Sequence, residues 1–230
     1  MSTFLELVND TERESGTVHQ ASRLSTVVGA KGRQEKIVGH VIEAWRLIQG
    51  ARTDWPWMRR TATRDLIPAQ ATYAATDFAV PITDHARWER GGEYGRRASF
   101  SIYDPAIGQQ EETELFWLPF DNWSRIYDFG VHDANRPTYF TVSPDRKLCI
   151  GPKPDKAYKI RLAYWCKPQV LAADDDVPIC PEEHHGTIVW RALMLLSGHD
   201  EAAFSLADAQ TKFAARFRDM VNDRDDYLEP

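Results

Sequence analysis

The sequence predicts an α+β fold: helix pairs from the N- and C-terminal ends of the chain form a helical bundle, and an antiparallel β module is inserted between them. Two observations lead to this prediction. Apolar residues recur with helical spacing in the first 60 residues and after residue 177, and they alternate with polar residues in between. Helices, strands and helices thus follow in blocks, as in segregated α+β layers. We expect residues 1–60 and 177–230 to form the bundle, and residues 61–176 to form the β-rich module.

Two helices are predicted at the N-terminal end. The first is a short amphipathic helix from Phe4 to about Gly16, and the second runs from about Lys31 to Gln49. The second contains an apolar stripe with the spacing that places side chains on one helical face. Gly50 stops this helix, and a bulky Trp-Pro-Trp-Met turn follows it.

The middle of the chain has the composition and alternation of β-strands. The clearest strand covers residues 157–165, where Tyr158, Ile160 and Leu162 alternate with more polar neighbours. A hairpin is expected around the turn at residues 144–146, because β-forming residues flank it on both sides. Further β-type segments are expected at residues 61–66, 97–103 and 115–120.

A helical hairpin is predicted for residues 177–223. Pro181 suits the first position of its first helix, since proline has no amide hydrogen to donate there. Residues 188–196 are apolar nearly all round, so this helix must be covered on most of its sides. A second, amphipathic helix follows the break at Gly198.

Composition restricts the classes of function. A chain of 230 residues with 43% hydrophobic residues is an ordinary globular protein, and no segment has the apolar length of a membrane span. The N-terminus also lacks a secretory signal pattern. A net charge of −6 argues against a protein that grips nucleic acid through its phosphates. The three cysteines form no CxxC pair and are predicted to be reduced thiols.

We expect no cofactor, no metal and no catalytic site. His184 and His185 lie near Glu183 and Cys180, but adjacent residues on a helix point about 100° apart, and no spacing matches a zinc site. These residues are interpreted as a polar first turn of the helix. The acidic residues 174–176 lack the spacing of a calcium loop and are interpreted as a solvated linker.

An aromatic group in the middle of the chain is the clearest candidate surface. We expect it to fill the β core or a subunit interface, because aromatic pairs across strands commonly do so. A sugar-stacking surface on the β module is the alternative. The candidates are Trp117, Phe120, Trp123 and Tyr127.

Three segments together resemble the head-to-tail adaptor proteins of tailed bacteriophages, also called connector or tail tubular proteins. The first is the helix at residues 5–10, followed by the longer helix that ends in residues 55–59. The second is the hairpin-and-strand run at residues 139–168. The third is the Val-Pro-Ile-Cys-Pro-Glu-Glu-His-His segment at residues 177–185, with the two helices that follow it.

The resemblance implies a structural virion protein rather than an enzyme, made in the host cytoplasm and located at the head–tail interface. Such adaptors form a ring, commonly a dodecamer, beneath the portal protein. The ring extends the DNA channel without binding a specific sequence, has no membrane partner, and supports a downstream tail or nozzle protein. In this family the C-terminal segment can reach the portal, which implies portal contacts for Asp223, Arg224, Tyr227 and Leu228.

Two alternatives to this function stay open. The protein could instead be another tail or connector component. It could also be an adaptor that cleaves peptidoglycan or binds glycans, because carboxylates brought together by folding leave no local signature in a sequence.

Overall fold

The computed structural model describes residues 1–16, 23–78, 82–90, 100–197 and 205–226. The chain divides into two compact units. The first, here called the helical unit, comprises Met1–Met58 and Pro168–Pro230. The second, here called the β unit, comprises Arg59–Lys167. None of the described helices is long and apolar enough to cross a membrane.

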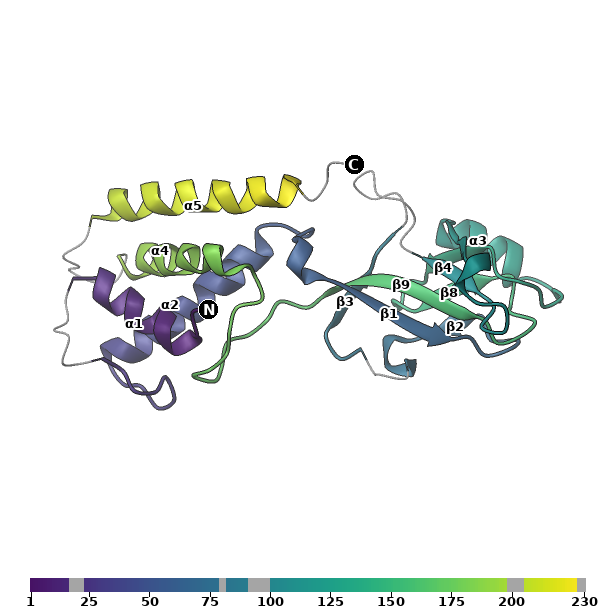
Figure 1. The fold of residues 1–230 in the computed structure, drawn as a ribbon, viewed down its shortest axis with the longest axis horizontal. Helices are drawn as coiled ribbons and strands as arrows, with labels where there is room; N and C mark the ends of the chain where they lie inside the picture. Colours follow the sequence, from purple (N-terminus) through teal and green to yellow (C-terminus); the bar gives the residue numbers. More distant parts are fainter. Residues whose placement is uncertain (17–22, 79–81, 91–99, 198–204, 227–230) are drawn as a thin grey trace. The chain divides into compact units, whose positions relative to one another are not determined.

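Helix α4 is the centre of the helical unit, where α1, α2 and α5 each pack against it (Figure 1). This arrangement follows from the apolar composition of α4, which leaves few of its faces suited to water. Helix α5 buries one face, with Ala209 and Met220 fully covered, while most of its other side chains are exposed. The elements are α1 (Phe4–Glu14), α2 (Arg33–Gly50), η2 (Pro56–Met58), η6 (Glu182–His184), α4 (His185–Leu196) and α5 (Leu206–Asp226).

The start of α1 is held by the acidic segment 174–176. The backbone amides of Phe4 and Leu5 donate hydrogen bonds to the carbonyl oxygens of Asp176 and Asp174, at 2.7 and 3.2 Å. The Asp174 carboxylate accepts a further bond from the Val27 amide at 2.6 Å. Two backbone amides donate to the Asp176 carboxylate, and they lower its pKa. The segment interpreted as a solvated linker therefore holds α1 in place.

The strands of the β unit form two sheets. In the larger one, β9 pairs with β1 along one edge and with β3 and β4 along the other, and β5 extends the sheet beyond β4. Its strands are β1 (Arg59–Asp65), β3 (His85–Trp88), β4 (Ser101–Tyr103), β5 (Thr113–Glu114) and β9 (Lys159–Cys166).

The smaller sheet has the strand order β2-β8-β7-β6. Its β7–β8 hairpin is antiparallel, whereas β6 and β7 are parallel, with Phe116 opposite Tyr139. Helix α3 packs against β7. The elements are β2 (Thr72–Tyr73), η3 (Ala75–Asp77), η5 (Gln109–Glu111), β6 (Phe116–Trp117), α3 (Phe120–Tyr127), β7 (Tyr139–Val142) and β8 (Leu148–Gly151).

Apolar packing connects the two sheets at their core. The rings of Phe100, next to β4, and Phe140, on β7, stack with centroids 4.0 Å apart. Both side chains are fully buried, and Ile102, Ile150 and Ile160 are buried as completely. Side-chain packing thus joins the smaller sheet, whose strands have only two to four residues, to the larger one.

The predicted architecture is wrong. The described residues form an α+β protein with five helices and two sheets, not a bundle of helix pairs that carries one antiparallel module. The N-terminal and C-terminal helices are organised around α4, because its apolar surface extends nearly all round. A fifth helix, α3, lies within the β unit, and one strand pair there is parallel.

Candidate functional site

The predicted aromatic candidates occupy two different environments. Three of them lie on α3, at the i, i+3 and i+7 spacing of one helical face. Trp123 is 3% exposed and lies between Phe120 and Tyr127, with ring centroids 6.1 and 5.9 Å away. Trp117, on β6, packs edge-on against Phe140, and the Arg90 guanidinium lies 5.3 Å from its ring centroid.

The α3 aromatics pack closely against β8 at Gly151. A methyl group at this position would lie 2.5 Å from Tyr127 and 2.8 Å from the indole nitrogen of Trp123. Only glycine therefore leaves room for both rings. Since Trp123 is buried on this side and flanked by aromatic rings on the others, its faces are not available for stacking on a sugar.

An exposed apolar surface lies around the same helix. Phe129 and Val131, which follow α3, are 70% and 100% exposed. Phe116 and Tyr139, which are opposite each other on β6 and β7, are also exposed, with ring centroids 6.3 Å apart. Contiguous exposed apolar patches often mark interaction sites, which makes these residues candidates for one. We call this set the apolar surface: Phe116, Ile126, Phe129, Val131 and Tyr139.

The residues predicted from the sequence are buried or partly buried, whereas the exposed apolar residues of this region were not among the candidates. The spacing of Phe120, Trp123 and Tyr127 is itself a helical signal, and it places Ile126 on a different face. If a helix is predicted at this position, Ile126 becomes a candidate for an exposed apolar residue. The β segment expected at residues 115–120 ends where this helix begins, and aromatic residues are common in strands as well.

A pocket of about 750 Å³ in the β unit is lined by basic side chains. Arg87, Arg90 and Arg146 contribute to its wall, together with Asp121. The Trp88 indole donates a hydrogen bond to the Arg146 carbonyl at 3.0 Å, which fixes this part of the wall. The guanidinium groups of Arg87 and Arg90 lie over the rings of Trp165 and Trp117, 5.1 and 5.3 Å from their centroids.

The two adjacent histidines are buried rather than part of an exposed polar turn. His185 is 2% exposed, and its Nδ1 accepts a hydrogen bond from the Ser2 amide at 3.2 Å. Its Nε2 lies 3.2 Å from the Cys180 carbonyl oxygen, which makes Nε2 the donor of the neutral ring. Burial lowers the pKa of His185, which favours this neutral form. His185 therefore links the N-terminal segment to the start of α4.

His184 makes a different contact. Its Nε2 lies 3.1 Å from Oδ2 of Asp223, which is 39 residues further along the chain, on α5. One carboxylate oxygen of Glu183, one ring nitrogen of His184 and one carboxylate oxygen of Asp223 all lie within 4.8 Å of one another. The sequence could not reveal this group, because the packing of α5 against η6 and α4 brings Asp223 to the histidine.

The predicted portal-contact candidates lie at the end of α5 and beyond it. Asp223 is partly exposed and contacts His184. Arg224 lies in the last turn of α5, and Tyr227 and Leu228 lie outside the described residues.

Comparison with protein families places both units in one family. The family described as SU10 adaptor protein matches residues 2–229, which is nearly the whole chain. Comparison with curated proteins finds no match. The match confirms the resemblance drawn from the sequence. Because it includes the helical unit and the inserted β unit together, the chain belongs to the SU10 adaptor proteins, a family of phage head-to-tail adaptors.

Proposed function

We propose that this structural phage adaptor forms a ring, a dodecamer, beneath the portal protein at the head–tail interface of the virion. The ring extends the DNA channel, through which DNA passes without sequence-specific binding, and it supports the attachment of a downstream tail protein. The observation that carries this proposal is the family match over residues 2–229. Residues from Asp223 to the C-terminus, including Arg224, Tyr227 and Leu228, contact the portal.

The apolar surface of the β unit supports a ring. Phe116, Phe129 and Val131 expose large apolar areas to water in the isolated chain. A contact with a neighbouring subunit would remove this area from water, at about 25 cal/mol per Å² of apolar surface buried. Head-to-tail contacts between identical subunits produce a ring when the rotation between neighbours closes. A contact between the apolar surface of one subunit and a different surface of the next is therefore sufficient to build a ring.

A mixing experiment with the portal ring tests this function. Purified protein and the portal ring from the same phage are combined, and the product is examined by native mass spectrometry and electron microscopy. We expect a discrete ring added to one end of the portal, with the end of α5 against the portal. If the portal is intact but no adaptor is bound to it in the mixture, the proposal is contradicted.

Changing the apolar surface should prevent ring assembly without unfolding the chain. We expect Phe129→Ser to reduce the amount of ring on the portal by roughly tenfold or more, the effect of truncating an interface hot spot, which costs about 2 kcal/mol or more. The melting temperature of the free chain should change little, because Phe129 is 70% exposed.

Ile107→Ser is the matched control for this variant. Ile107 is another exposed apolar residue of the β unit, in the connection that follows β4, and it does not belong to the apolar surface. Its replacement should leave ring assembly unchanged. Equal losses in the two variants, or no loss in Phe129→Ser, would remove the apolar surface from the interface.

A further inference from the structure

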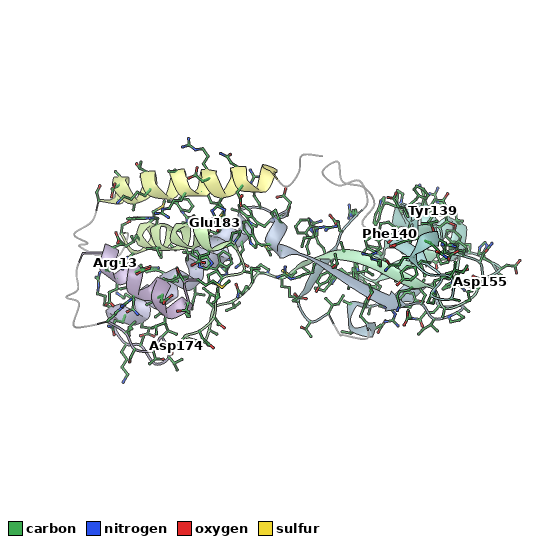
Figure 2. The ribbon with its side chains drawn as sticks, in the orientation of Figure 1. Arg13, Tyr139, Phe140, Asp155, Asp174 and Glu183 are labelled. Atoms are coloured by element: carbon green, nitrogen blue, oxygen red, sulfur yellow. The ribbon has the colours of Figure 1, made fainter. Side chains whose placement is uncertain are left out.

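Three side chains with metal-ligating atoms converge between the start of α4 and the end of α5. They are Glu183 and His184 of η6 and Asp223 of α5, and their ligand atoms all lie within 4.8 Å of one another. Figure 2 shows Glu183 in the helical unit, near the start of α4 and beneath α5. Two sequence-adjacent residues and one distant residue thus meet at one point.

The geometry at His184 already approaches that of two ligands on one ion. Its Nε2 and Oδ2 of Asp223 are 3.1 Å apart. Two ligands bound to tetrahedral zinc, each about 2.1 Å from the ion, are about 3.4 Å apart. The His184 side chain is only 8% exposed, so the packing around it fixes the orientation of its ring. Glu183 is exposed and Asp223 partly exposed, so their carboxylates are free to move toward an ion bound at His184.

The charges of the group also favour a cation. Glu183 and Asp223 both carry carboxylates within 4.8 Å of each other, and like charges at this separation repel. One imidazole can donate one hydrogen from Nε2, so it serves one carboxylate at a time. A divalent cation would bind both carboxylates and the imidazole nitrogen together.

We propose that Glu183, His184 and Asp223 bind a divalent transition metal ion, with Zn²⁺ as the preferred occupant. Imidazole nitrogen is a ligand for zinc and its neighbours in the transition series, whereas Mg²⁺ and Ca²⁺ prefer oxygen alone. Three protein ligands leave the fourth tetrahedral position to water or to a group from a partner. Glu183 is exposed and Asp223 partly so, which gives the ion a path from solvent.

The bound ion would connect the last turn of α5 to η6. This helix packs mainly against α4 and makes a smaller contact with η6. A ligand on α5 and two ligands on η6 would join these elements through metal–ligand bonds. An ion that binds only the folded state stabilises it in proportion to the logarithm of its concentration.

Thermal unfolding of the full chain with added metal tests the site. After treatment with a chelator and its removal, Zn²⁺ at about 100 times its dissociation constant should raise Tm by roughly 5–10 °C. Mg²⁺ at the same concentration should leave Tm unchanged. Isothermal titration should give one tight zinc site per chain. Absence of a zinc-dependent shift would show that the three residues form only a hydrogen-bonded contact, and would overturn the proposal.

Variants of the ligands assign the site. His184→Gln and Asp223→Asn should weaken zinc binding by more than about tenfold, since loss of even an outer-shell partner costs about 10–100-fold. Glu183→Gln keeps the test valid even if the substitution of the buried His184 unfolds the chain. Glu183 is exposed, so its replacement should not alter Tm in the absence of metal.

Asp219→Asn is the matched control, one helical turn earlier on α5 and exposed. It should keep the full response to zinc. A zinc response that survives Glu183→Gln and His184→Gln, or that is lost in Asp219→Asn, would place the ion elsewhere and overturn the proposal.

Discussion

Replacement of Phe140 with alanine should lower the free energy of unfolding of the β unit by about 3–5 kcal/mol. Phe140 is fully buried and stacks on Phe100 at 4.0 Å, a contact that joins the two sheets. It also supports the edge of the Trp117 ring. The change removes the ring and leaves a cavity in the packing between the two sheets. Urea unfolding followed by tryptophan fluorescence measures the effect.

Tyr139→Ala is the control for this variant. Tyr139 is the preceding residue on the same strand and points to the opposite side, where it is exposed (Figure 2). Its replacement should cost under about 1 kcal/mol. Similar losses in the two variants would show that the strand itself, rather than the contact between the sheets, determines the stability of the β unit.

Arg59→Met should destabilise the β unit by about 1–3 kcal/mol, the cost of removing a hydrogen-bond donor from a buried carboxylate. The Arg59 Nε donates to the Glu89 carboxylate at 2.8 Å, and the Glu89 side chain is only 1% exposed. Methionine retains most of the apolar stem of arginine and removes the charge. Denaturant unfolding of Arg59→Met and of the double variant with Glu89→Gln tests this account, and the second change should restore part of the stability.

An exposed ion pair in the same unit provides the comparison. Arg161 lies 3.2 Å from Glu112 and is half exposed, so Arg161→Met should cost about 0–1 kcal/mol. The two substitutions are chemically identical and both lie on strands of the larger sheet. If they cost the same, burial of Glu89 is not the cause of the Arg59 effect.

The elements that the sequence predicted well are those with a long periodic pattern. The helix expected from Lys31 to Gln49 is α2, and the strand expected at residues 157–165 is β9. The apolar composition of residues 188–196 correctly indicated a helix covered on most sides. In each case one pattern extends over eight or more residues, and local sequence then dominates the outcome.

Short elements and distant contacts could not be obtained in this way. Strands such as β5 and β6 have two residues each, which is too few to show alternation. Helix α3 has eight residues rich in aromatic side chains, a composition that also favours strands. The pairing of His184 with Asp223 depends on how α5 packs, so neither residue indicates the other locally.

The central position of α4 has a consequence for the order of folding during synthesis. The apolar faces of α1 and α2 are covered by a helix that the ribosome makes more than 130 residues after α2 ends, since α2 ends at Gly50 and α4 begins at His185. The β unit ends at Lys167, so all of its strands emerge before α4 does. The apolar surface of α1 and α2 that α4 covers in the folded protein therefore stays exposed on the nascent chain until its last quarter emerges, and chaperones that bind apolar segments have that interval in which to act.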